Sequence, residues 1–310
     1  MYPIKSCHAA TVDGVPPKSL DVGKTGLEAY GVCDREYVIA ENIDNRSELH
    51  FVTQRGWGSN NRSDRSKKGD TILATVQPNI TAESLELKGP EGFGKVIIPA
   101  RYAAAGEQRT VEIFGRPLPN AIDQGDEASE FFSAILGRKV RLLRANRDTP
   151  RKLKPHYEHG GAVNTVAAAD GFPILLTNQT SLDFSHKLNG FEPGAVPLQQ
   201  FRGNIEIDGL GFEPYDEDFW GEITVGSLHA FVSKACQRCP VPNVNQETGE
   251  RNIRGQQVLR GRLGYVDDPS ARQVVFGQNL NHVYEKGLYV RVGDIVQVMQ
   301  RSNKRNFTLV

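Results

Sequence analysis

The sequence contains few of the residues that mark several common classes of protein. Its 310 residues include only four cysteines, too few for a disulfide scaffold, so we expect reduced thiols. Lysine plus arginine number 37 and aspartate plus glutamate also 37, so no net charge favours nucleic acid or an anionic membrane. The apolar runs fall short of the roughly 18 residues of a membrane helix, and the N-terminus lacks the apolar core of a signal peptide. These absences predict a globular, cytoplasmic protein.

Short β-rich runs account for most of the patterned sequence. They are bounded by Gly, Asn or charged residues, as strands in globular proteins commonly are. The runs lie at residues 36–42, 50–55, 84–89, 95–101, 109–115, 203–211, 221–233, 272–278 and 287–300. In the last run a Gly-Asp bend separates two strands. The sequence therefore predicts a mainly β fold with a few helices.

Two segments predict helices. The first, Asp126–Leu136, has acidic residues in its first turn, where they favour a helix N-terminus, and Gly137 follows as a stop. The second, Thr180–Leu188, opens on a hydroxyl that we expect to cap the helix, and it closes before Gly190.

Polar, basic segments surround the first helix. The stretch Arg138–His159 predicts a linker or lid with a strand only in its first part, and hence a domain boundary between residues 120 and 160. The segment Arg55–Asp70 is rich in Gly, Ser and Asn and predicts an exposed loop. The basic runs Arg62–Lys68 and Arg138–Lys154 raise nucleic-acid binding as a hypothesis. Zero net charge and sparse aromatic residues favour a solvated face instead.

The segment Phe231–Gly249, FVSKACQRCPVPNVNQETG, holds Cys236 and Cys239. Structural zinc would require two further ligands, and neither a second Cys-x-x-Cys pair nor a closely spaced histidine pair follows. A redox dithiol would require a helix after the pair, which the two following prolines oppose. Two interpretations remain: two buried structural thiols, or one thiolate that acts on a bound group. For the latter, the neighbouring Lys234 and Arg238 would stabilise the thiolate and attract an anion.

Other residues suited to an anionic ligand are scattered along the chain. Lys5 and Ser6, in YPIKSC, combine a point charge with a hydroxyl, which suits a phosphate. Arg35 opens a strand. In FRGN, Arg202 can bind a phosphate with two donors, while Asn204 offers both a donor and an acceptor to a heterocycle. Each signal is weak alone, because an arginine at a strand end usually pairs with a carboxylate.

Taken together and in order, these segments resemble the MOSC family. The segments are YPIKSC, GLEAYGVCDREYV, TQR, ADGFPILLTNQTSLDF, FRGNIEI, EDFWGEITVG, CQRCPVPNVNQETG, FGQNL and GLYVRVGD. More narrowly, the chain resembles the branch with a MOSC N-terminal domain, which includes the mitochondrial amidoxime-reducing component and its bacterial relatives. The resemblance runs from Tyr2 to about Val298. We accordingly expect a MOSC N-terminal β-rich domain (1–120), a helix and basic linker (121–160) and a MOSC β-barrel domain (161–310).

The resemblance implies a molybdenum cofactor, a pyranopterin dithiolene that carries a phosphate. It implies that Cys239 is the thiolate ligand of molybdenum, a metal environment that soft sulfur suits, and that Cys236 is a supporting thiol. The other implied cofactor contacts are Lys5, Ser6, Arg35, Asp170, Gly171, Phe172, Arg202, Asn204 and Arg238, with residues 170–172 contributing backbone groups.

The chain departs from the family pattern at two places. Gly203 stands where the family usually has proline, and the segment after Arg55 is longer and more basic than usual, which affects the expected access of a substrate. No cysteines remain for an iron–sulfur cluster. We therefore expect electrons from a separate donor, either ferredoxin-like or cytochrome b5-like with a reductase.

The resemblance implies an oxidoreductase that reduces N-hydroxylated compounds, such as amidoximes, hydroxylamines or N-oxides. The alternative is a carrier of persulfide sulfur or of the molybdenum cofactor. Because we expect no pyridoxal-phosphate domain, a carrier would take its sulfur from a separate donor. We expect neither a nucleic-acid partner nor a membrane segment.

Overall fold

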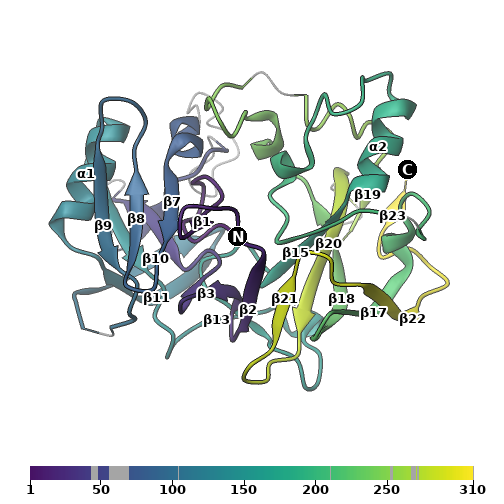
Figure 1. Cartoon of the computed structure of the whole chain (residues 1–310), viewed down its shortest axis with the longest axis horizontal. Coiled ribbons are helices and arrows are strands. Elements are labelled where there is room, and N and C mark those ends of the chain that lie inside the picture. Colours follow the sequence, from purple (N-terminus) through teal and green to yellow (C-terminus); the bar gives the residue numbers. More distant parts are fainter. Residues whose placement is uncertain are drawn as a thin grey trace.

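The computed structural model describes residues 1–42, 48–55, 70–103, 105–209, 211–251, 254–266, 270 and 272–309. The described chain is mostly β, as predicted, with two α-helices, α1 (Asp126–Leu136) and α2 (Gln179–Leu188). Two groups of strands lie side by side, and the N-terminal segment runs between them (Figure 1). No helix in the described part is long and apolar enough to cross a membrane.

The N-terminal group contains a closed barrel and a small sheet. The barrel consists of β5 (Tyr37–Glu41), β6 (Leu49–Phe51), β10 (Gln108–Ile113), β11 (Arg116–Asp123) and β12 (Arg141–Arg144). The sheet consists of β1 (Thr11–Val12), β7 (Gln77–Ile80), β8 (Ser84–Lys88) and β9 (Lys95–Pro99). Alternation explains the sheet, because Leu85 and Leu87 face inward and pair with Ile98 and Val96 on the neighbouring strand. Helix α1 contacts β9 and β12.

The C-terminal group is an eight-stranded sheet. Its path runs β16 (Ile205–Ile207), β15 (Ile174–Asn178), β20 (Gln273–His282), β18 (Leu228–Gln237), β17 (Trp220–Val225) and β22 (Val296–Arg301), with β19 (Leu263–Tyr265) and β23 (Thr308–Leu309) off that path. Among the described strands, the closed barrel therefore lies in the N-terminal group. Strands β17 and β18, from the predicted run 221–233, form a hairpin. The expected bend before β22 is a turn in which the Asp294 amide donates to the Arg291 carbonyl at 3.1 Å.

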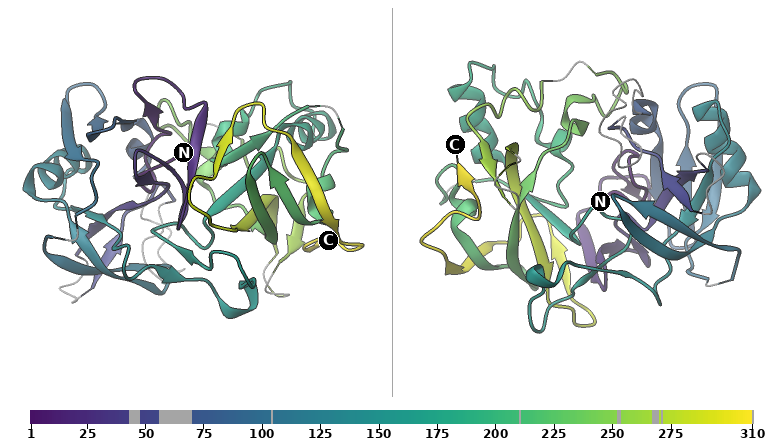
Figure 2. Two further views of the ribbon diagram at one scale, coloured as in Figure 1. Left: turned by 60° about the horizontal axis from the view of Figure 1, so that its bottom comes forward. Right: turned by 180° about the vertical axis from the view of Figure 1, so that it is seen from behind.

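Two further pairings link distant parts of the chain. Strand β2 (Ser19–Gly23) pairs with β3 (Gly26–Ala29) and with β21 (Tyr289–Arg291), and β4 (Val32–Cys33) extends this sheet. Strand β13 (Arg151–Lys152) pairs with β14 (Thr165–Val166). The largest cluster of buried apolar side chains includes Leu85, Leu27 and Trp220, so it draws on both groups of strands. Figure 2 shows the N-terminal strands between the two groups from two other directions.

The ends of the two helices test the predicted caps. Helix α1 has the predicted bounds, and Gly137 ends it in the left-handed conformation (φ 67°). Helix α2 begins one residue earlier than predicted. Its cap is the side chain of Asn178, which accepts a hydrogen bond from the Thr180 amide at 3.0 Å. The predicted Thr180 cap is wrong because the strand before it ends at Asn178, which is thereby placed at the helix entrance.

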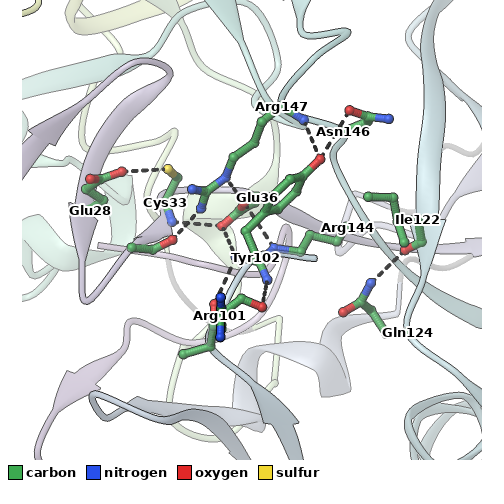
Figure 3. A network of polar contacts seen from close by, with 12 residues as sticks. Glu28, Cys33, Glu36, Arg101, Tyr102, Ile122, Gln124, Arg144, Asn146 and Arg147 are labelled. Carbon is green, nitrogen blue, oxygen red and sulfur yellow. Dashed lines mark hydrogen bonds and ion pairs between the residues drawn. The ribbon is translucent and has the colours of Figure 1, made fainter. Parts of the chain in front are cut away.

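The basic stretch after α1 is internal in part. The side chains of Arg144 and Glu36 are both only 2% exposed and form an ion pair at 3.0 Å, and Arg147 donates to Glu36 at 2.8 Å. Figure 3 shows this network, in which the Cys33 thiol also donates to Glu28. The predicted solvated face is therefore wrong for these arginines, because the carboxylates that neutralise them lie far away in sequence. The other basic run, residues 62–68, and most of the predicted loop 55–70 lie outside the described residues.

Candidate functional site

One pocket brings together all the residues that the sequence singled out. Its walls contain Lys5, Ser6, Arg35, Asp170, Gly171, Phe172, Arg202, Asn204, Cys236, Arg238 and Cys239. They come from the N-terminal segment, the turn before β5, the loop before β15, the segment before β16 and the end of β18. The pocket therefore lies where both groups of strands contribute side chains.

Three of these residues have left-handed backbone conformations. Ser6 (φ 73°), Arg35 (φ 48°) and Arg202 (φ 58°) are among the few described non-glycine residues with positive φ. Such residues cost about 1–3 kcal/mol each and persist only when neighbouring contacts fix them. Here the Arg35 amide donates to the Tyr2 carbonyl at 2.7 Å, and the Arg202 amide donates to the Gln199 carbonyl at 3.0 Å. Part of the backbone strain of the chain thus lies in the pocket wall.

Arg35 and Arg202 form one connected wall. The Arg35 guanidinium pairs with buried Asp34 and donates to the Arg202 carbonyl at 3.0 Å and to Asn204 Oδ1 at 3.1 Å. The Tyr2 ring lies 4.1 Å from the Arg202 guanidinium and 4.9 Å from that of Arg35. A cation–π contact of this kind orients a guanidinium without neutralising its charge.

Asp170 faces the opposite charges in the pocket. It pairs with Lys5 and, at 2.8 Å, with Arg55. Burial alone would raise the pKa of the Asp170 carboxyl, but Lys5 and Arg55 outweigh burial and hold this pKa well below its usual range. Burial lowers the pKa of Lys5, although Asp170 opposes that change. Asp170 is therefore an ionised counter-ion in the pocket wall, with a side chain that is half exposed.

The pocket is strongly positive although the chain as a whole is neutral. Within the described part of the chain, five cationic side chains but only one carboxylate line it: Lys5, Arg35, Arg55, Arg202 and Arg238, against Asp170. Several of these cations are buried, and burying uncompensated charge is costly. Such a pocket is suited to a ligand with more than one negative charge.

The two cysteines are presented together by an irregularity in β18. Its register with β20 shifts between Ala235 and Gln237, and a bulge of this kind redirects side chains. Cys236 and Cys239 both line the pocket, and both thiols are free. Arg238 Nη1 lies 3.1 Å from the Cys236 sulfur. Arg55 interacts with Cys239. Each sulfur therefore has a neighbouring guanidinium.

Two buried donors in the pocket wall have no hydrogen-bond partner among the residues that the structure describes. They are Asn204 Nδ2 and Arg238 Nε. The other groups of these side chains are engaged, since Asn204 Oδ1 accepts from Leu175 and Arg238 Nη2 donates to the Phe201 carbonyl. Because buried polar groups are normally satisfied, these two donors indicate a ligand with hydrogen-bond acceptors.

A clamp behind the pocket explains two of the sequence motifs. Gln246, in NQETG, accepts from Arg202 Nη1 at 2.8 Å and exchanges hydrogen bonds with Gln54, in TQR. Gly249 (φ 73°) follows closely, and a Cβ there would lie 3.0 Å from the Thr71 carbonyl oxygen. The segment after the cysteines is thus fastened to the N-terminal group of strands.

A second cavity adjoins the first at the cysteines. It shares Arg55, Asp170, Cys236 and Cys239 with the pocket, and Phe114, Lys234 and Gln273 also line it. Arg55 is a site residue that sequence reasoning missed, although the TQR motif contained it. Its guanidinium lies 4.4 Å from the centre of the Phe114 ring. Arg55 lines both cavities, and Phe114 lines the second.

Comparisons with known proteins find the family that the sequence motifs resemble. Residues 163–297 match the family model described as MOSC domain. "Mitochondrial amidoxime reducing component 2" of Macaca fascicularis is 27% identical over 96% of this chain and 82% of its own length. "Mitochondrial amidoxime-reducing component 1" of Xenopus laevis is 26% identical over 97% of this chain and 81% of its own. "Molybdenum cofactor sulfurase" of Bos taurus is 26% identical over 98% of this chain, which spans 32% of that protein.

A solution structure of a Bordetella bronchiseptica protein aligns with 36% of this chain and 73% of its own at 16% identity. Its TM-score of 0.26 is too low to support a shared fold. The sequence matches are the informative ones, and they agree with the motifs from which the resemblance was drawn. The chain carries a MOSC domain and is similar over nearly its whole length to the mitochondrial amidoxime-reducing components.

Proposed function

We propose that this protein binds a molybdenum cofactor in the pocket and reduces N-hydroxylated compounds with electrons from a separate donor protein. The observation that carries the proposal is the joint presence of five cations, two thiols and unpartnered donors in one pocket of a neutral chain. The similarity to amidoxime-reducing components supports the same activity.

The pocket's residues fit the chemistry of that cofactor. A phosphate and a dithiolene are anionic, which suits Lys5, Arg35 and Arg202. The pterin heterocycle offers acceptors, which suits the unpartnered Nδ2 of Asn204. A soft thiolate suits molybdenum, and we assign this role to Cys239, with Cys236 as a supporting thiol.

When bound, the cofactor would supply the two electrons of the reduction. The overall reaction takes R–NHOH, two electrons and two protons to R–NH2 and water. Asp170 is a poor source of those protons, because Lys5 and Arg55 keep it ionised. Its role in this chain is instead to hold Arg55 beside Cys239. The adjoining cavity, with Phe114 and Gln273, would hold the substrate next to the cysteines.

The donor would be a ferredoxin-like protein, or a cytochrome b5-like protein with its reductase. A cytoplasmic location and the division at residues 1–120, 121–160 and 161–310 remain predictions.

The alternative function is that of a persulfide or cofactor carrier. The similarity to molybdenum cofactor sulfurase supports it, as does the hydrogen bond from Arg238 to the Cys236 sulfur, which would stabilise a sulfur anion. In that case a persulfide would form on Cys236 or Cys239 after incubation with a cysteine desulfurase. Mass spectrometry would detect it as one added sulfur atom.

Metal analysis and pterin fluorescence of the purified protein test the proposal. We expect molybdenum and pterin in the native protein and in Cys236→Ser, and loss of molybdenum in Cys239→Ser. Cys33→Ala is a matched control, because it removes a thiol outside the pocket. Loss of molybdenum in both pocket variants, or in neither, would contradict the assignment of Cys239.

Turnover is measured with an artificial reductant and benzamidoxime on the molybdenum-loaded protein. We expect benzamidine as the product, in proportion to the molybdenum content. A loaded protein that reduces neither amidoximes nor hydroxylamines would refute the reductase, and a stable added sulfur on Cys239 would favour the carrier.

A further inference from the structure

Arg151, in β13, is a buried arginine without a carboxylate partner in the described structure. It is only 3% exposed. Nη1 donates to the Ala169 carbonyl at 2.7 Å, but Nε and Nη2 have no hydrogen-bond partner. Two of the other buried arginines differ, since Arg144 pairs with Glu36 and Arg262 with Asp218. An arginine in this state carries an unusually large uncompensated cost of burial.

The position of Arg151 connects it to the pocket. Ala169, which it holds, is itself part of the pocket wall and directly precedes Asp170. Pairing of Arg151 with Val166 fixes the strand that leads into this wall. The charge of Arg151 affects the pocket, because it lowers the pKa of Lys5. Burial and the nearby Arg116 lower the pKa of Arg151 to about 10, although Asp170 opposes that change, so the side chain is still charged at neutral pH.

We propose that Arg151 is a positioning residue of the anion pocket, which holds the wall from Ala169 to Phe172 and supplies a buried positive charge that a bound anion compensates. The part that concerns the cofactor rests on the proposed function. The part that concerns anion binding requires only the pocket. Arg151 lies behind the wall and does not line the cavity, so its effect on a ligand passes through the backbone of that wall and through its charge.

This role predicts two effects of opposite sign. Without an anion, the uncompensated charge destabilises the fold, so Arg151→Met removes a cost and raises the melting temperature by about 2–4 °C. With an anion, the same charge is favourable, so its removal weakens binding on the order of tenfold. A residue that only fills space would instead lower stability when replaced and leave the affinity unchanged.

The experiment measures melting temperature and calorimetric affinity for inorganic pyrophosphate in the purified full chain. The variants are Arg151→Met, which removes the charge, and Arg151→Lys, which keeps it. We expect the methionine variant to melt higher without pyrophosphate and to bind it about tenfold more weakly. We expect the lysine variant to bind within about threefold of the native affinity.

Arg262→Met is the matched control, because this buried arginine has a partner, Asp218, and does not line the pocket. It should melt lower and bind pyrophosphate as the native protein does. Lower stability of Arg151→Met with unchanged affinity would overturn the proposal. If that variant does not fold, a tenfold loss of affinity in Arg151→Lys would equally overturn it. Because pyrophosphate binding needs no turnover, failure of the reductase assay leaves this test intact.

Discussion

Glu217 gives the sharpest prediction of how stability depends on pH. It is 1% exposed, in the short 3-10 helix Asp216–Phe219. Burial raises the pKa of its carboxyl to about 7, against the hydrogen bonds that Asn178 and Ser181 donate to it at 2.9 Å. Its ordinary value is 4.5. A difference of about 2.5 units corresponds to a free energy of about 3 kcal/mol.

Stability falls as the pH rises, because the folded state binds the proton of Glu217 more tightly than the unfolded state does. The stabilisation is complete below pH 4.5 and is lost as the pH rises through 7. In Glu217→Gln the side chain stays neutral, so this loss disappears. Relative to the native protein, the variant should gain about 3 kcal/mol between pH 4.5 and pH 8.

The assay is urea unfolding of both proteins at several pH values in that range. Subtracting the two unfolding free energies removes the contributions of other groups, such as Asp218, whose pKa burial also raises. A difference in unfolding free energy that stays constant across the range would refute the assignment of a raised pKa to Glu217. Such a difference would report only the altered hydrogen bonds of the glutamine.

Two substitutions near the pocket should have local effects. In Gly203→Ala the new Cβ would lie 2.4 Å from Thr177 Oγ1, so we expect a loss of about 1–3 kcal/mol in urea unfolding, most of it regained in the double variant with Thr177→Ala. An additive double variant would contradict this explanation. Gln246→Ala removes the hydrogen-bond partner of Arg202 Nη1 and of Gln54 Oε1 and should cost about 1–3 kcal/mol. The neighbouring Glu247→Ala, which removes an exposed ion pair, should cost at most about 0.5 kcal/mol, and equal losses would refute the clamp.

Local patterns predicted the secondary structure well. Alternating apolar residues identified β8 and β9, and the flanking signals of α1 gave both of its ends. These features depend on residues close together in sequence. The cap of α2 was missed because Asn178 serves two elements, as the last residue of β15 and as the helix cap.

The site was less accessible from residues alone. Lys5 and Arg202 gave weak signals separately, and the family resemblance grouped them; the structure brings them into one pocket. Arg151 was missed because its charge placed it in a basic stretch that predicted a solvated linker. Burial of an arginine depends on long-range contacts, such as those of Arg144 with Glu36, which a charge pattern does not reveal.

The composition of the pocket wall constrains the order of events during synthesis. The wall needs Lys5 from the start of the chain and Cys239 from its last quarter, while β2 pairs with β21 (Tyr289–Arg291). A ribosome that has finished only the N-terminal barrel has therefore exposed cations without the thiols or the clamp at Gln246. Any ligand of this pocket must consequently be inserted after the residues up to β21 have emerged, and a nascent fragment that ends earlier cannot retain it.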